Sequence, residues 1–314
     1  QKEEIPKSSV NWVVKEKNSK PSVKWDERDQ FYDRIKDLDS KEKIQEIRKE
    51  ITKDFGNEVL WIEYGSELRS AERYEESLQA YNTVLIKDSK NRLALLGKGF
   101  VLQKLERWSD SKESFENVLQ NDPKNIDALL EVGYCWIQLT DSKKYDKAID
   151  YYKKALNEDE RLKNALDNLG YCYYRKDEYT TALDYLKRSC IIEGKDDSFA
   201  KKFIALCYFR SDDNDEAEKV CDELIKKKTD DGYVYYMKGW ILNESEKYSE
   251  AIVHLKTGLR FGETLGLYQA LGFAYLELKK YNLAKMYYEN SLEIRNTDVS
   301  FTNLGWCYYK QGNY

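Results

Sequence analysis

Apolar residues recur along this chain at spacings of three and four positions, which is the pattern of helices that bury one face. Near the N-terminus the pattern predicts a helical pair over residues 26–38 and 41–55, with Ser40 as the N-cap of the second helix and Gly56 ending it. The apolar residues of this pair are Phe31, Ile35, Leu38, Ile44, Ile47 and Ile51. The pair, residues 26–57, lacks the small residues of the units that follow it, so we expect a capping unit with a polar outer side.

From residue 58 onward the helical pattern contains a recurring pair of small residues, one in each of two successive helices. The pairs are Gly65 with Ser77, Gly99 with Ser111, Gly133 with Ala148, Gly170 with Ala182, Ala205 with Ala217, Gly239 with Ala251 and Gly272 with Ala284, and an eighth copy begins at Gly305. The first members of successive pairs are 34, 34, 37, 35, 34, 33 and 33 residues apart. A period in this range indicates a solenoid of stacked helix pairs, in which small residues let two helices approach closely.

The residue types around these pairs are repeated as well. The fullest copies contain Leu166, Leu169, Gly170, Tyr173, Ala182 and Leu186, and Tyr268, Leu271, Gly272, Tyr275, Ala284 and Tyr288. An aromatic residue closes most turns within a pair, namely Tyr74, Trp108, Tyr145, Tyr179, Tyr248, Tyr281 and Tyr314. Over about residues 58–314 these positions resemble the tetratricopeptide repeat family. The resemblance implies an all-α, right-handed superhelical solenoid of antiparallel helix pairs. The expected repeats are 58–91, 92–125, 126–162, 163–197, 198–231, 232–264, 265–297 and an incomplete 298–314.

Two repeats depart from this pattern. Three residues are inserted around positions 140–144, which lengthens one turn. In the fifth repeat Ala205 replaces the glycine, Lys201 replaces the bulky residue and Asn214 replaces the turn aromatic. The segments 194–197 and 211–215 that flank its first helix are polar and acidic. We expect any hinge of the solenoid to lie here; simple drift of the repeat sequence is the alternative.

The termini and the overall charge limit the classes of partner. Residues 1–25 contain two prolines and an excess of Lys over Glu without helical periodicity, which predicts a flexible arm. Within the arm, Trp12 and the two valines after it either form a docking anchor or fold back onto the first helices. The formal net charge of −5 gives no electrostatic basis for binding nucleic acid. The longest apolar run, residues 128–139, is shorter than the roughly twenty residues of a membrane-spanning helix.

Residue types that perform catalysis are scarce. His254 is the single histidine, and we expect it to have no catalytic partner. The sequence contains no P-loop, no GxGxxG, no HExxH, no calcium-binding loop and no GxSxG motif. We therefore predict a non-catalytic protein with no cofactor, no metal site and no small-molecule substrate.

The cysteines bear on the compartment. Cys135, Cys172, Cys207 and Cys307 each lie two residues after a small inter-helix residue, where a compact apolar side chain is expected. We interpret them as reduced structural thiols, which favours a cytoplasmic location. The alternative is an exported, envelope-associated protein whose signal peptide has been removed, because the chain begins at Gln1.

The resemblance also predicts where a partner binds. It places the first helix of each repeat on the concave face, with groove residues at fixed offsets from the small residue. In an idealised repeat the residue directly after the small one is usually polar, whereas here it is mostly aromatic from the third repeat onward. The predicted partner-binding residues are Tyr134, Tyr171, Tyr174, Phe209, Tyr233, Tyr236, Trp240, Phe273, Trp306 and Tyr309. A contiguous exposed apolar surface is unusual unless a partner covers it; the alternative is that a tightly wound superhelix buries these rings itself.

We therefore expect a scaffold or adaptor that binds an extended or helical segment of a partner protein with apolar or Pro-rich anchors. Family members that clamp the acidic C-termini of heat-shock chaperones have Lys three residues before the small residue and Asn directly after it. Here Ile62 and Ser66 occupy these positions in the first repeat, and Lys202 is followed by Leu206, so we exclude that role. The alternative to a free-standing adaptor is the recruiting arm of a larger multidomain protein or enzyme that extends beyond residue 314.

Overall fold

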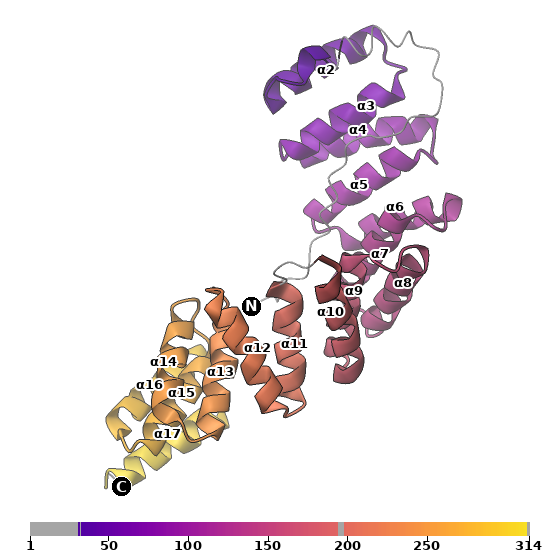
Figure 1. Ribbon diagram of the computed structural model, residues 1–314. Helices are drawn as coiled ribbons and strands as arrows, with labels where there is room; N and C mark the ends of the chain where they lie inside the picture. Colours follow the sequence, from indigo (N-terminus) through magenta and orange to yellow (C-terminus); the bar gives the residue numbers. More distant parts are fainter. Residues whose placement is uncertain (1–30, 32, 194–197, 313–314) are drawn as a thin grey trace. The chain divides into compact units, whose positions relative to one another are not determined.

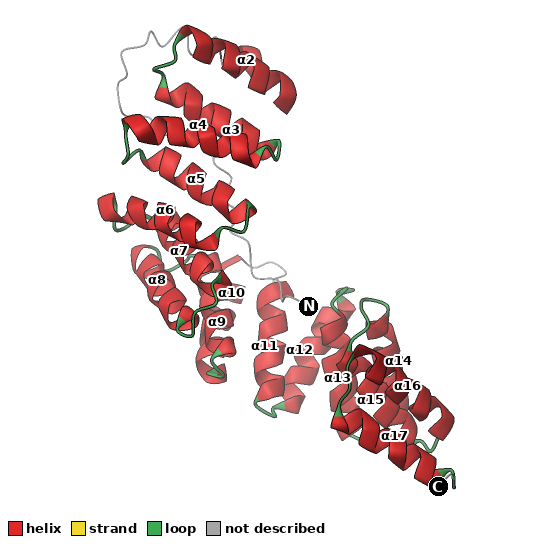
Figure 2. Ribbon diagram, turned by 180° about the vertical axis from the view of Figure 1, so that it is seen from behind, coloured by secondary structure: helices red, strands yellow, loops and turns green. Residues whose placement is uncertain are grey.

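The computed structural model describes residues 31, 33–193 and 198–312, and the regular structure in these ranges is helical (Figure 1). The predicted arm with Trp12, residues 26–30 and 32 of the first predicted helix, and the acidic flank 194–197 lie outside the described residues. The chain divides into an N-terminal unit that ends at Cys172 and a C-terminal unit that begins at Tyr173. The all-α prediction is confirmed, and Figure 2 shows helices joined by short loops.

The N-terminal unit is a stack of helix pairs. Its helices are α2 (Ser40–Lys53), α3 (Glu58–Ser70), α4 (Tyr74–Lys87), α5 (Arg92–Lys104), α6 (Trp108–Asn121), α7 (Ile126–Gln138), α8 (Lys144–Glu158) and the greater part of α9 (Lys163–Arg175). Helix α3 packs against α4, α5 against α6 and α7 against α8. We call the first helix of each repeat the A helix and the second the B helix, so α3, α5, α7 and α9 are A helices.

The C-terminal unit continues the same alternation. Its helices are α10 (Tyr179–Glu193), α11 (Ser198–Arg210), α12 (Asn214–Lys226), α13 (Gly232–Glu244), α14 (Tyr248–Leu259), α15 (Leu265–Glu277), α16 (Tyr281–Ile294) and α17 (Asp298–Lys310). The A helices are α11, α13, α15 and α17, and α13 contacts α15 directly. None of the described helices is both long and apolar enough to cross a lipid bilayer.

The small residues lie where an A helix and a B helix touch. A Cβ atom on Gly99 would lie 2.6 Å from the ring of Phe115, and one on Gly133 would lie 2.8 Å from the ring of Tyr152. Real Cβ atoms do not approach so closely, so only glycine fits at these contacts without moving the ring. Ser111 also donates a hydrogen bond of 2.9 Å to the backbone carbonyl of Gly99, which ties the two helices together.

The turns from A to B helices share one backbone feature. Each of the three-residue turns contains a residue with positive φ: Glu72, Glu106, Asp177, Asp212, Glu246 and Lys279. In the last repeat Gly312 occupies this position, with a φ of 76°. The turn between α7 and α8 differs, because the insertion lengthens it to residues 139–143. There the Asp141 carboxylate accepts hydrogen bonds from the Lys143 amide and the Lys147 ammonium.

Two details of the capping pair differ from the prediction. The N-cap of α2 is Asp39, whose carboxylate accepts a 2.9 Å hydrogen bond from the Glu42 amide, and Ser40 is the first helical residue. Either side chain can cap a helix, and the aspartate one position earlier takes the role. The helix then ends at Lys53 with Asp54 as its C-cap, and Gly56 lacks the positive φ of a helix-ending glycine.

The cysteines behave as core residues. Cys135, Cys172, Cys207, Cys221 and Cys307 are buried, and Cys190 is half-buried. Burial raises the pKa of Cys135 to about 11 and the pKa of Cys207 and Cys221 to about 12. These three thiols therefore stay protonated near neutral pH, and such thiols are poor nucleophiles.

Candidate functional site

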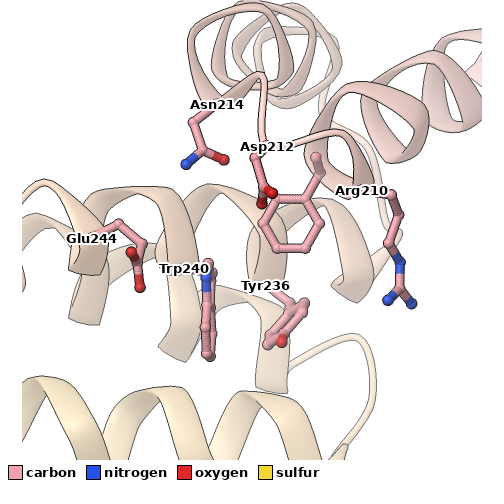
Figure 3. Close-up of a pocket in the computed structure, with 7 residues that line it drawn as sticks. Arg210, Asp212, Asn214, Tyr236, Trp240 and Glu244 are labelled. Atoms are coloured by element: carbon pink, nitrogen blue, oxygen red, sulfur yellow. The ribbon is translucent and has the colours of Figure 1, made fainter. Parts of the chain in front are cut away.

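A pocket of about 470 Å³ opens in the C-terminal unit beside α11 and α13 (Figure 3). It is lined by Phe209, Arg210, Asp212, Asn214, Tyr236, Trp240 and Glu244. Helix α11 supplies the first two residues, the turn after it and the start of α12 supply the next two, and α13 supplies the last three. Its volume is in the range of pockets that bind ligands or side chains of a partner.

The aromatic side of the pocket is built by helical spacing. Tyr233, Tyr236 and Trp240 follow one another at three and four positions on α13, so they share one face of that helix. The ring centres of Tyr236 and Trp240 are 6.1 Å apart, and those of Tyr233 and Tyr236 are 5.2 Å apart. Phe209 from α11 meets Tyr236 edge to face at 6.4 Å. These separations are those of favourable aromatic pairs, so the rings hold one another in place.

Burial is uneven among these rings. Trp240 is 39% exposed, whereas Tyr236 is half-buried. Burial, with the neighbouring Tyr233, raises the pKa of Tyr236 to about 12. Its hydroxyl is therefore neutral at physiological pH and available as a hydrogen-bond donor or acceptor.

Charged and polar side chains form the other side of the pocket. In Figure 3, Asp212 and Asn214 face Tyr236 and Trp240, while Glu244 and Arg210 lie at opposite ends. Burial acts to lower the pKa of Arg210, but interactions with Tyr233 and Tyr174 outweigh it and raise the pKa, so the guanidinium stays charged. Within the part of the chain that the structure describes, neither the Asp212 nor the Glu244 carboxylate forms an ion pair.

At the pocket one ring of a repeated aromatic contact is absent. In three other repeats an aromatic residue closes the A-to-B turn. Its ring packs edge to face on a ring in the A helix of the following repeat, namely on the residue directly after the small residue of that helix. These pairs are Trp108 with Tyr134 at 5.9 Å, Tyr145 with Tyr171 at 6.3 Å and Tyr248 with Phe273 at 6.2 Å. In the fifth repeat the turn residue is Asn214, and the residue it would cover is Trp240. Asn214 places no ring on Trp240, which is 39% exposed; a turn ring alone does not bury its partner, since Phe273 beneath Tyr248 is 38% exposed.

The ten predicted partner-binding residues fall into four groups. Phe209, Tyr236 and Trp240 line the pocket, and Tyr233 packs on Tyr236 beside it. Phe273, Trp306 and Tyr309 are exposed, on α15 and α17. Tyr134 is half-buried against Trp108 on its own unit.

The remaining two, Tyr171 and Tyr174, correct the prediction of exposed rings. Tyr171 is 3% exposed, and Tyr145 packs on it edge to face at 6.3 Å. Tyr174 is also buried, with Phe203 at 5.3 Å and Tyr179 at 6.0 Å from its ring. For these two positions the alternative holds, since neighbouring helices cover the rings.

The sequence interpretation missed the polar half of the pocket, namely Arg210, Asp212, Asn214 and Glu244. The signal was present, because Asn214 interrupts a series of turn aromatics. The sequence pattern alone favours a hinge or drift at Asn214 and does not indicate its place beside Trp240.

The structure also bears on metal and acid–base chemistry. Among the described residues no three His, Cys, Asp or Glu side chains gather closely enough to hold a metal ion. His254 lies on α14, and burial together with the charge of Lys238 lowers its pKa. It is therefore neutral at physiological pH.

Sequence comparisons agree with the helix-pair architecture. The family model described as Psidin, N-terminal TPR repeats region, matches residues 68–184, and a tetratricopeptide repeat model matches residues 265–298. The uncharacterized protein ycf37 of Guillardia theta is 32% identical over 98 residues, which cover 29% of this chain and 55% of that protein. The TPR repeat-containing protein MJ1428 of Methanocaldococcus jannaschii is 26% identical over 196 residues, which cover 57% of this chain and 33% of that protein. The chain thus matches about half of the length of the first relative and a third of the second.

A comparison with solved structures supports the same fold. A tetratricopeptide repeat protein from Parabacteroides merdae superimposes with a TM-score of 0.60 at 18% identity, covering 80% of this chain and 98% of that one. Stacked A and B helices joined at small residues define an all-α helical-repeat protein. Tetratricopeptide repeat models and relatives thus match parts of this chain, and its fold is that of a tetratricopeptide repeat protein.

Proposed function

We propose that this chain is a non-catalytic adaptor that binds a segment of a partner protein at the pocket of Phe209, Tyr236 and Trp240. The tetratricopeptide repeat fold is a protein-interaction scaffold, and the proposal adds the place of binding. The observation that carries it is the part-exposed ring of Trp240 beside this pocket, at a contact between repeats whose turn residue is Asn214. A large aromatic ring beside a pocket is the typical centre of a binding hot spot.

The surface continues beyond the pocket along the C-terminal unit. Phe273 and Trp306 occupy the same repeat position as Trp240, on α15 and α17, and are 38% and 48% exposed. Neighbouring helices pack about 8–10 Å apart, and an extended chain advances about 3.3 Å per residue. A bound extended segment would therefore place its anchors about three residues apart, one for each A helix.

The test is a selection of peptides from a random library on the purified chain, followed by affinity measurement with the selected peptides. We expect Trp240→Ala to weaken binding by about tenfold to a hundredfold, the usual loss at an aromatic hot spot. The matched control is Phe261→Ala, since Phe261 is 43% exposed but lies outside the pocket, after α14. Equal loss in both variants, or no loss in Trp240→Ala, contradicts the proposed site.

A further inference from the structure

Cations of the chain itself lie over aromatic rings at two positions equivalent to Trp240. Phe100 and Trp306 are, like Trp240, the residues directly after the small residue of their A helices. The guanidinium of Arg69 lies 5.9 Å from the ring centre of Phe100, and the ammonium of Lys310 lies 4.7 Å from that of Trp306. An aromatic face attracts a cation at such distances, and tryptophan does so most strongly.

Trp240 has no such cation among the described residues. Lys310 lies five positions after Gly305, and the residue five positions after Gly239 is Glu244. The repeat position that supplies an ammonium group to Trp306 therefore supplies a carboxylate beside Trp240. A second carboxylate, that of Asp212, faces the ring across the pocket in Figure 3.

We propose that the pocket selects a partner segment that carries a Lys or Arg side chain, whose cationic head lies on Trp240 and pairs with Asp212 and Glu244. The proposal rests on the proposed function and names the anchor that this site recognises. The alkyl stem of such a side chain packs on Tyr236 and Phe209, and its head meets two carboxylates that have no ion pair within the described chain. The side chain thus finds both the apolar and the charged surface it needs.

The carboxylates around the pocket disfavour the binding of an acidic side chain of a partner. An incoming carboxylate would meet Asp212 and Glu244 and would lose its hydration without gaining a partner there. The only cation of the lining, Arg210, lies at the opposite end of the pocket from Glu244 and interacts with Tyr174 and Tyr233. A neutral apolar anchor would fill the space but would bury part of two carboxylates without compensation.

The test uses the random peptide library, selected in parallel on four forms of the purified chain. These are the wild type, the charge-neutral double variant Asp212→Asn with Glu244→Gln, the pocket-filling variant Asn214→Tyr, and the control Glu106→Gln. Asparagine tolerates the positive φ of Asp212, so the double variant keeps the shape of the pocket. Glu106 occupies the same turn position in the second repeat, in the N-terminal unit, so its variant controls for loss of a turn carboxylate.

We expect Lys or Arg to be enriched at one position of the peptides selected by the wild type and by Glu106→Gln. The double variant should lose this enrichment and bind a selected cationic peptide about tenfold more weakly, and added salt should weaken wild-type binding. Selection of peptides with neutral or acidic anchors, without enrichment of Lys or Arg, would contradict the proposed cationic anchor. It would not contradict the proposed binding site. If the wild type enriches no peptide beyond those that the Asn214→Tyr variant enriches, both the proposed anchor and the proposed function are contradicted.

Discussion

Two contacts between repeats, one in each unit, show how this protein differs along its length. In the N-terminal unit the ring of Tyr145 covers Tyr171, which is 3% exposed. In the C-terminal unit Asn214 stands where that covering ring would be, and Trp240 is 39% exposed beside a pocket. We call the first the closed contact and the second the open contact. The comparison shows that one repeat position holds a buried ring in the first contact and a part-exposed ring beside a pocket in the second, while the helix pairs around both are retained.

The largest expected effect separates core rings from exposed rings. Tyr152, in the unit of the closed contact, is fully buried against Gly133, so Tyr152→Ala should lower the free energy of unfolding by about 3–5 kcal/mol. Trp240→Ala at the open contact should lower it by only about 1–2 kcal/mol, because 39% of the residue is already exposed. Urea denaturation of both variants measures the difference. A loss at Trp240 as large as that at Tyr152 would show that Trp240 belongs to the core.

The second prediction opens the closed contact. Tyr145→Asn imitates the fifth repeat, and it should lower the free energy of unfolding by about 1–2 kcal/mol because a half-buried ring and its partner lose their contact. The same variant should expose Tyr171, which chemical modification of tyrosines followed by mass spectrometry detects. Asn214→Ala, at the open contact, is the control and should change stability little. If Tyr171 stays protected in Tyr145→Asn, the turn aromatic is not what closes the contact.

The third prediction separates backbone strain from binding. Asp212 and Glu106 both have φ near +60°, where a side chain is disfavoured by about 1–2 kcal/mol and glycine is not. After the entropy of glycine in the unfolded chain is subtracted, Asp212→Gly and Glu106→Gly should each raise the free energy of unfolding by about 0.5–1 kcal/mol. Only Asp212→Gly should also weaken the binding of a cationic peptide. Titration of that peptide into each variant measures its affinity. A gain in stability from one variant alone would mean that the two turns are not equivalent.

The smallest effect concerns pH and arises only in the unit with the open contact, which holds the single histidine. Burial, followed by the charge of Lys238, lowers the pKa of His254 below 6.5, and Asp222, Glu250 and Glu218 oppose this only in part. The folded state therefore favours the neutral imidazole, so its contribution to stability is present above pH 6.5 and is lost as the pH falls through the folded pKa.

His254→Gln removes this dependence. We expect the Tm of the wild type to fall slightly more than that of the variant on acidification below pH 6.5, with carboxylate effects common to both proteins. Scanning calorimetry at a series of pH values measures the difference. A larger acid-induced fall in the variant would reverse the assigned sign.

The periodic part of the fold could be predicted from the sequence because it depends on local patterns. Small residues such as Gly99 and Gly133 mark contacts between consecutive helices, and the structure shows rings packed directly on them. Where two neighbouring residues can both cap a helix, the sequence pattern does not decide between them. Asp39 rather than Ser40 caps α2 for this reason.

The candidate site was predicted only in part, because exposure depends on side chains from another repeat. Tyr171 and Trp240 have the same repeat position and the same aromatic character, yet one is covered and the other open. Their turn residues also differ, Tyr145 for the first and Asn214 for the second, each 26 residues earlier in the chain. A prediction that treats one helix at a time does not detect such a pair. A comparison of each turn residue with the ring that it faces in the following repeat does.

The most direct test of the account measures the solvent accessibility of the Trp240 indole in the wild type and in Asn214→Tyr. Paramagnetic relaxation of the indole N–H by a soluble gadolinium chelate reports it, with the resonance assigned by Trp240→Phe. The account predicts that the introduced ring packs on Trp240 as Tyr145 packs on Tyr171, so the relaxation falls markedly while the fold is retained. Unchanged relaxation in a folded Asn214→Tyr variant would contradict the claim that the missing turn aromatic opens the site.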